Sequence, residues 1–288
     1  MKLLIAGCGE LGITLGLRLC AAGHTVHGLR RRGDRIPAPI QPIIADLADP
    51  ATLTALPPSV DSLVYTATPG AFSDSGYEAA YVNGLRNILD ALPDAGRQLQ
   101  RAIFVSSTSV YGDVEGDWVT EDTPTRPTSF SGRRLLQAEA IALGLPQGLV
   151  VRFGGIYGPG RERMLRKVRN AEPVSAEPPR WTNRIHRDDC VGVLEHLLHL
   201  QNPESVYLGV DDHPCPMHEV TDWLATQLAL PKPPRGDASE ATARGGNKRC
   251  SNRRLRVSGY RFVHPDFRSG YGEMLRQAST DDDAPPPA

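Results

Sequence analysis

Long hydrophobic runs, paired cysteines and an excess of either charge are all missing from this 288-residue sequence. No stretch reaches the ~18 apolar residues of a membrane helix. An apolar run of roughly 7–15 residues, as in a secretory segment, does not fit ahead of Cys8. Lysine and arginine number 32 against 33 acidic residues, so the charge balance predicts no nucleic-acid and no membrane partner.

The cysteines are few, odd in number and without metal-ligand spacing, which predicts reduced thiols in a cytoplasmic protein and no metal site. They are Cys8, Cys20, Cys190, Cys215 and Cys250. The hydrophobic content of 40% is enough to build a core in a chain of this length.

A complete strand, glycine turn, helix and strand unit opens the chain. Residues 2–6 are predicted to form a buried strand, residues 13–22 a helix and residues 25–29 a second strand. Between the first strand and the helix lies a G-x-G-x-x-G turn at 7–12, the context in which this motif indicates a dinucleotide site.

Each glycine of the turn has a physical task. Gly7 permits the tight turn, Gly9 lets the backbone approach a pyrophosphate, and Gly12 lets helix and strand pack closely. The helix N-terminus adds N–H groups and a positive dipole end for the phosphates. The alternative is a glycine turn without a ligand.

The end of the second strand bears on the choice of cofactor. NAD sites usually place an acid there, on the ribose 2′-hydroxyl. Here the stretch is Arg30, Arg31 and Arg32, and the first acid is Asp34. Because a guanidinium pairs bidentately with phosphate, Arg30 and Arg31 are candidates for the 2′-phosphate of NADP. A solvated basic turn is the alternative, and NAD stays open.

Strand and helix signals continue to alternate through the first half. Apolar strands are predicted at 41–45, 62–66, 101–105 and 148–153, and a helix at 77–92. Nearly continuous apolar strands separated by helices indicate a parallel sheet covered on both faces. Pro42 donates no backbone hydrogen bond, which places it at the start of its strand or on an edge. The predicted fold class is therefore α/β, a Rossmann-type doubly wound parallel sheet with a smaller C-terminal α/β substrate domain.

Prolines break up the second half, around helices at 189–200 and 217–228 and a strand at 206–210. The predicted organisation gives residues 1–160 and 183–212 to the NADP-binding domain. Residues 161–182 and 213–275 form the substrate-binding domain, and 276–288 a disordered tail.

Further motifs lie in order at 83–89, 105–112, 151–160 and 184–189. With the glycine turn, they make the chain resemble the extended short-chain dehydrogenases, the NAD-dependent epimerase/dehydratase family, from Met1 to about Leu275. The resemblance implies a Rossmann domain for the cofactor, a smaller domain for the substrate, and typically nucleotide-linked sugar substrates. A homodimer also occurs in that family.

The family's chemistry rests on a Ser or Thr, a Tyr and a Lys, and the tyrosine moves the proton. Ser107 matches the serine. Anchoring the Tyr-x-x-x-Lys segment on Glu139 places Ser131 at the tyrosine and Leu135 at the lysine. The chain therefore resembles atypical members that lack this dyad.

Other residues offer weaker alternatives. Tyr111 and Tyr157 are more typical of packing than of acid–base chemistry. His186 is more typical of a residue that fixes a turn, and Asp188 or Asp189 of a cap on the helix that follows. Arg133 and Arg134 would either touch a phosphate or ribose or be exposed helix charges. A late basic stretch would serve a substrate diphosphate or form a solvated surface; it consists of Arg244, Lys248, Arg249, Arg253, Arg254 and Arg256.

The resemblance completes the cofactor site by placing Asp46 beside the adenine ring and the small residues Ala67 and Thr68 along the cofactor. The predicted cofactor-binding set is Gly7, Gly9, Glu10, Leu11, Gly12, Arg30, Arg31, Asp46, Leu47, Ala67 and Thr68.

Two functions follow. The first is an NAD(P)-dependent epimerase/dehydratase-like oxidoreductase acting on a nucleotide-linked or phosphorylated small molecule, with Ser107 orienting the reacting oxygen. The second, motivated by Ser131 and Leu135, is a non-catalytic NADP-binding protein that senses redox state or supports assembly of a partner.

Overall fold

The computed structural model describes residues 1–92, 99–236 and 246–282. Contacts divide the chain into two units. The first consists of residues 1–112, 124–152 and 191–207, and the second of 113–123, 153–190 and 208–288.

A seven-stranded sheet dominates the first unit, with strand order β11-β7-β5-β4-β1-β2-β3. The pairs β1–β2, β2–β3, β1–β4 and β4–β5 are parallel. The strands are β1 (Lys2–Ala6), β2 (Thr25–Arg30), β3 (Gln41–Ile44), β4 (Ser62–Tyr65), β5 (Arg101–Ser107), β7 (Gly148–Phe153) and β11 (Val206–Gly209). This order, with the reversal between β1 and β4, confirms the predicted Rossmann-type fold.

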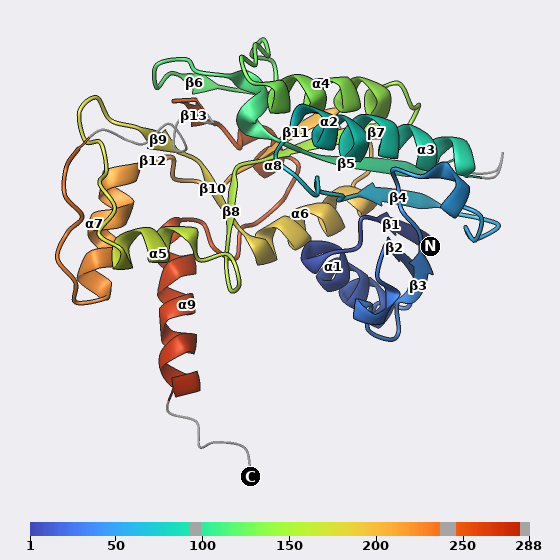
Figure 1. Ribbon diagram of the computed structural model, residues 1–288, viewed down its shortest axis with the longest axis horizontal. Coiled ribbons are helices and arrows are strands. Elements are labelled where there is room, and N and C mark those ends of the chain that lie inside the picture. The colour runs from blue at the N-terminus through green and yellow to red at the C-terminus, as the bar shows by residue number, and fades with distance from the viewer. Residues whose placement is uncertain (93–98, 237–245, 283–288) are drawn as a thin grey trace. The chain divides into compact units, whose positions relative to one another are not determined.

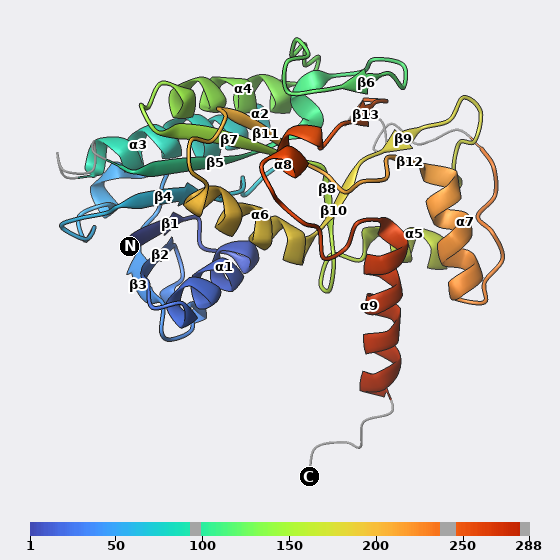
Figure 2. The same cartoon turned by 180° about the vertical axis from the view of Figure 1, so that it is seen from behind.

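Helices cover both faces of the sheet, with α1 (Glu10–Ala21) and α6 (Arg187–His199) on one face (Figures 1 and 2). The opposite face carries α2 (Asp74–Tyr77), α3 (Gly84–Ala91) and α4 (Phe130–Leu143). The burial of β1 and β4 follows from this coverage: Leu3, Leu4 and Ile5 are fully buried. Pro42 lies in β3 at the sheet edge, as its missing N–H predicted.

The helix predicted at 77–92 is one continuous helical segment with an irregular middle. A π-helical stretch, Glu78–Asn83, joins α2 to α3. The Tyr65 hydroxyl donates to the carbonyl of Ala80 within this stretch. A hydroxyl that enters the helical hydrogen-bond ladder is a known cause of such irregularity, and sequence periodicity does not show it.

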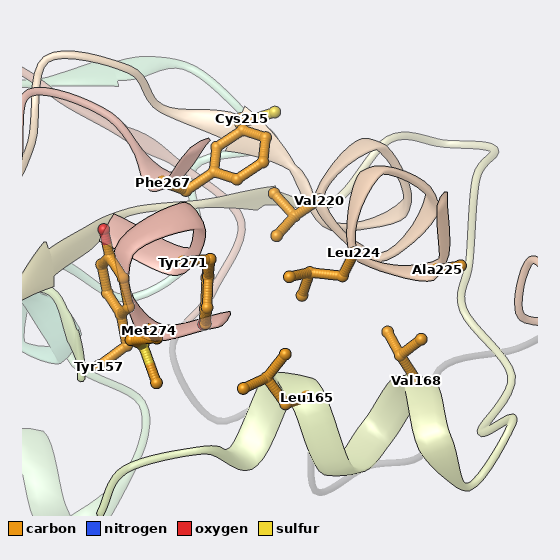
Figure 3. Close-up of a cluster of buried hydrophobic side chains, with 10 residues drawn as sticks. All are labelled: Tyr157, Leu165, Val168, Cys215, Val220, Leu224, Ala225, Phe267, Tyr271 and Met274. Atoms are coloured by element: carbon orange, nitrogen blue, oxygen red, sulfur yellow. The ribbon is translucent and has the colours of Figure 1, made fainter. Parts of the chain in front are cut away.

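Short strand pairs and four helices make up the described part of the second unit. Here β8 (Gly155–Tyr157) pairs with β10 (Arg184–His186), β9 (Trp181–Thr182) with β12 (Cys215–Pro216), and β6 (Trp118–Val119) with β13 (Arg249–Cys250). The helices are α5 (Arg163–Arg169), α7 (Met217–Gln227), α8 (Arg253–Val257) and α9 (Phe267–Asp282). Figure 3 shows the apolar side chains of α5, α7 and α9 meeting in one buried cluster; it contains Tyr157, Leu165, Val168, Cys215, Val220, Leu224, Ala225, Phe267, Tyr271 and Met274.

The observed units and the predicted domains have different bounds. Residues 113–123 and 153–160 belong by their contacts to the second unit, because β6 pairs with β13 and β8 with β10. Helix α9 continues to Asp282, so residues 276–282 are helical where the sequence predicted disorder. The remaining tail residues, 283–288, lie outside the described residues.

Candidate dinucleotide-binding site

The glycine turn between β1 and α1 is held by backbone hydrogen bonds. The N–H groups of Gly7 and Cys8 both donate to the carbonyl of Leu29 on β2, at 3.0 and 2.8 Å. Gly7 has φ of +84°, and a β-carbon built on it would lie 2.3 Å from the α-carbon of Ala67. Only glycine fits this position, because both the φ angle and the approach of Ala67 exclude a side chain.

The other two glycines differ in their surroundings. A β-carbon on Gly12 would lie 2.9 Å from Cγ2 of Ile5, so Gly12 allows α1 to pack closely on β1. A β-carbon on Gly9 would meet nothing nearer than the Gly7 carbonyl oxygen, at 3.8 Å. Gly9 therefore faces open space at the start of α1, and its predicted approach to a pyrophosphate stays a prediction.

A pocket of about 830 Å³ opens in front of this turn. Its lining contains every predicted cofactor-binding residue except Glu10, Leu11 and Gly12, which belong to the first turn of α1. The lining residues are Gly7, Cys8, Gly9, Leu29, Arg30, Arg31, Arg32, Arg35, Ala45, Asp46, Leu47, Ala48, Ala67, Thr68, Gly70, Ala71, Gly76, Ala79 and Ala80.

Four arginines from neighbouring positions in the sequence line this pocket. Arg30 ends β2, and Arg31 and Arg32 follow it. The sequence prediction did not include Arg35, which is brought to the pocket by the 3-10 turn Gly33–Arg35. Such a cluster has the charge and the donor geometry for a phosphate group.

Asp46 lies in the lining at the end of β3, but its carboxylate also shapes the chain locally. Oδ1 of Asp46 accepts a hydrogen bond from the N–H of Ala48 at 3.0 Å. The carbonyl of the neighbouring Leu47 accepts from Nδ2 of Asn87 at 2.9 Å, which ties this wall of the pocket to α3. Contact of Asp46 with an adenine ring stays a prediction.

The sequence prediction missed the helical wall of the pocket. Ala79 and Ala80 line it from the π-helical stretch, and Gly76 lines it from α2. Their small side chains leave room in front of the glycine turn. In the sequence Tyr77 and Glu78 separate Gly76 from Ala79 and Ala80, so no continuous run of small residues indicated this wall.

Cys8 is the one thiol in the lining. Burial raises its pKa to about 11, against a smaller opposing effect of Arg30. A thiol with such a pKa stays protonated near neutrality and is a poor nucleophile. Cys8 therefore serves as a small apolar side chain beside Gly12 and Gly28.

Ser107 ends β5 and does not line this pocket. Its Oγ accepts a hydrogen bond from the N–H of Ser109 at 3.2 Å and so caps the turn Thr108–Tyr111. The position at the carboxyl end of a central strand suits a ligand-binding residue. Its catalytic role stays a prediction.

Helix α4 carries the segment where the resemblance places the Tyr–Lys dyad. Ser131 and Leu135 are one turn apart, with 8% and 4% of their surfaces exposed. The Oγ atoms of Ser131 and Ser129 lie 3.0 Å apart at the start of this helix. Neither serine nor leucine carries a group that titrates near neutrality or donates like a lysine ammonium.

One turn further on, Glu139 anchors a buried polar network. Nη2 of Arg152 donates to Oε2 of Glu139 at 2.6 Å, and the Ser106 hydroxyl donates to Oε1 at 2.5 Å. Nη1 of Arg152 donates to the Tyr111 hydroxyl oxygen at 2.7 Å. These four side chains join β5, β7, α4 and the turn after β5, so Tyr111 is a buried member of a structural network.

The other residues considered as candidates for the site also contact other parts of the protein. Arg134 donates from Nε to Asp74 and from Nη1 to Glu78, and Arg133 donates to the carbonyl of Thr128. Tyr157 is 3% exposed in the apolar cluster of the second unit, and burial raises its pKa well above the usual value.

His186 is buried next to a second imidazole. Its ring centroid lies 4.0 Å from that of His264, and its Nδ1 accepts from the N–H of Asp188 at 3.3 Å. Burial, with the His264 charge second, lowers its pKa to about 4. The carboxylate of Asp189, predicted as a helix cap, instead accepts from the N–H groups of Val263 and His264.

Three arginines of the late basic stretch make contacts within the second unit. Arg249 stacks on the Trp181 ring with 4.7 Å between its guanidinium carbon and the ring centroid. Arg254 pairs with Asp122, and Arg256 with Asp212. Arg244 lies outside the described residues. Arg249, Arg254 and Arg256 thus already have protein partners.

The described residues contain no helix long and apolar enough to cross a membrane.

Comparisons with known proteins agree with this geometry. The family model for the NAD-dependent epimerase/dehydratase family matches residues 3–198. Protein YeeZ of Escherichia coli K12 is 29% identical over 285 residues, covering 92% of this chain and 97% of that protein. A solved structure assigned to an NAD-dependent epimerase/dehydratase of Methylobacillus flagellatus is 42% identical, covers 96% of this chain and 98% of its own, and has a TM-score of 0.81.

A more distant structure, MoeE5 in complex with UDP-glucuronic acid and NAD, is 23% identical with a TM-score of 0.76. It covers 96% of this chain and 99% of its own. At this level of sequence identity, the similarity shows a shared fold only. The chain belongs to the NAD-dependent epimerase/dehydratase family, whose model covers about two thirds of it.

Proposed function

We propose that this protein binds NADP and transfers hydride between the nicotinamide ring and a carbon of a small-molecule substrate. The observation that carries the proposal is that one pocket is lined both by the glycine turn and by four arginines, Arg30, Arg31, Arg32 and Arg35. The cofactor-binding set predicted from sequence belongs to this proposal.

The residues present suit such a dinucleotide. Gly9 leaves space at the N-terminus of α1, whose first N–H groups have no acceptor within the helix and favour a phosphate. The arginines offer guanidinium donors where an NAD-specific site would usually offer a carboxylate. A phosphate on the 2′-oxygen of the ribose would satisfy them, which favours NADP over NAD.

The bound dinucleotide would supply or accept the hydride. The chain would hold it through the glycine turn, the arginines and the small residues Ala67 and Thr68, and Ser107 would orient the reacting oxygen. We propose a nucleotide-linked or phosphorylated substrate, because members of the resembling family typically act on nucleotide-linked sugars. The structure of MoeE5 with UDP-glucuronic acid supports this substrate class.

A substrate screen tests this function. The purified protein is loaded with NADPH, and cofactor oxidation at 340 nm is followed with a broad panel of carbonyl compounds, including nucleotide-linked 4-keto sugars. Oxidation that depends on one substrate class, and falls with Arg30→Ala, supports the proposal. NADPH that binds but is not oxidised with any member contradicts it.

Ser131 and Leu135 favour a second function, a non-catalytic NADP-binding protein. This function predicts cofactor binding without turnover and a partner protein whose affinity changes with NADP. A pull-down from the native host with and without NADP distinguishes the two, because an enzyme needs no such partner.

A further inference from the structure

Three aromatic rings contact one another at the start of helices α2 and α4. The Phe72 ring centroid lies 5.1 Å from that of Phe130 and 5.5 Å from that of Tyr77. Tyr77 and Phe130 are 5.5 Å apart, with their planes at 88°. These are the spacings and edge-to-face angles that aromatic rings prefer. We call these three residues the aromatic triad.

The triad is partly open to solvent. Phe72 is 52% exposed, and Tyr77 and Phe130 are half-buried. A single exposed ring is ordinary on a protein surface, but three touching rings form a contiguous apolar patch of the kind that marks a binding site.

The triad lies at the ligand-binding edge of the sheet. Phe72 is in the connection that leaves the carboxyl end of β4, the edge at which α/β folds bind ligands. Phe130 begins α4, and its ring contacts with Phe72 and Tyr77 bring it to the same place. Gly70 and Ala71, just before Phe72, line the dinucleotide pocket, and so does Gly76, just before Tyr77.

An ion-pair clamp fixes this part of the first unit. Arg134 donates from Nε and Nη2 to the two carboxylate oxygens of Asp74, at 2.8 and 2.9 Å. Nη1 of the same side chain reaches Oε1 of Glu78 at 2.9 Å. Because Asp74 and Glu78 flank Tyr77, the clamp holds α2 against α4 and keeps the rings together.

We propose that Phe72, Tyr77 and Phe130 form a subsite that holds an aromatic ring of the substrate at the edge of the dinucleotide pocket. The inference rests on the proposed function and narrows its substrate to a ring-bearing carbonyl or alcohol. Continuity with the pocket through Gly70, Ala71 and Gly76 favours a ligand over a second copy of the chain, which the test below includes as the alternative occupant.

Two matched probes test the subsite. The protein is first saturated with NADP⁺ so that no aldehyde is reduced. Benzaldehyde and cyclohexanecarbaldehyde are then titrated separately, with binding followed by NMR chemical-shift changes. The two probes have the same carbon count and aldehyde group, so only the aromatic ring differs. We expect benzaldehyde to bind about three- to tenfold more tightly, the range of a favourable aromatic contact.

Substitutions at Phe72 test whether the preference for benzaldehyde arises at the aromatic triad. Phe72→Ala is expected to weaken benzaldehyde binding about three- to tenfold. Phe72→Leu keeps apolar area without a ring and is expected to reduce the preference for benzaldehyde over cyclohexanecarbaldehyde. Leu143→Ala is the matched control. It removes a 38% exposed apolar side chain at the opposite end of α4, roughly 20 Å away by helix rise, and is expected to change neither affinity.

Equal affinity for the two probes would overturn the subsite while leaving the proposed function intact. The same holds if Phe72→Ala converts a dimer to a monomer in light scattering without changing the benzaldehyde affinity, since the triad would then be a contact between copies. Failure of NADP⁺ to bind, seen before any probe is added, would overturn the proposed function and the subsite with it.

Discussion

The α-carbon of Ala67 lies 2.3 Å from the position that a β-carbon on Gly7 would occupy. This contact joins the turn after β1 to the connection after β4, the two strands at which the sheet order reverses. A side chain on Gly7 would push these connections apart, and both of them line the pocket.

Gly7→Ala is therefore expected to weaken NADPH binding at least tenfold and to destabilise the fold. Gly23→Ala is the matched control, since Gly23 has nearly the same φ, +83°, but no atom within 4 Å of a built β-carbon. That control should lose only the ~1–2 kcal/mol of a left-handed residue and bind NADPH normally. Similar NADPH affinities for the two variants would contradict the steric argument.

The arginine cluster predicts a cofactor preference that mutation removes. Arg30→Ala with Arg31→Ala is expected to weaken NADPH roughly 10- to 100-fold, the range of lost hydrogen bonds to a charged group. NADH affinity should stay nearly unchanged, because NADH lacks the 2′-phosphate. Arg86→Ala, an exposed arginine on α3 outside the pocket, is the control. Equal losses for both dinucleotides would mean that the arginines do not contact the 2′-phosphate.

The Glu139–Arg152 pair predicts a large stability loss. Both side chains are buried, at 2% and 6% exposure. Glu139→Ala leaves the Arg152 guanidinium buried without its carboxylate, which costs about 3–5 kcal/mol of the free energy of unfolding. Arg134→Ala breaks two ion pairs at the surface, with Asp74 and Glu78, and should destabilise the protein much less, because water screens such pairs. Urea unfolding measures the free energy of unfolding of both variants. Equal losses of stability would show that burial does not determine the cost of breaking these ion pairs.

Asp211 predicts a stability change with pH. Burial raises its pKa to about 8 from 3.8, although the Arg184 charge opposes this. The folded state thus binds the proton more tightly than the unfolded chain, so stability falls as pH rises from about 4 to about 8. Asp211→Asn stays neutral at every pH. The difference between its melting temperature and that of the wild type should therefore shift in favour of the variant as the pH is raised from 5 to about 8.5. Asp117→Asn, an exposed acid of the same unit, should show no such gain. A constant difference across this pH range would rule out the raised pKa.

Local sequence patterns predicted the first βαβ unit correctly. The strands, the helix and the turn at 2–30 follow from apolar periodicity and from glycines whose tasks are local. Several pocket residues that the prediction missed come from outside this unit. Arg35 lies in a 3-10 turn after β2, and Ala79 and Ala80 lie in the π-helical stretch before α3.

Side-chain partners were the least predictable part of the molecule. Asp188 or Asp189 was expected to cap the helix that became α6. The carboxylate of Asp189 instead binds the backbone of Val263 and His264, more than seventy residues away. The role of Arg134 depends likewise on Asp74 and Glu78 from another helix. Sequence spacing does not show long-range contacts of this kind, whereas it does show the strands and helices that carry them.

The most direct test of the account is a fluorescence titration of the purified protein with NADPH and NADH in parallel. Tight binding of NADPH with clearly weaker binding of NADH is the predicted result, because the arginines at the end of β2 favour a 2′-phosphate. Binding of neither dinucleotide, or tighter binding of NADH, would contradict the proposal that this pocket holds NADP.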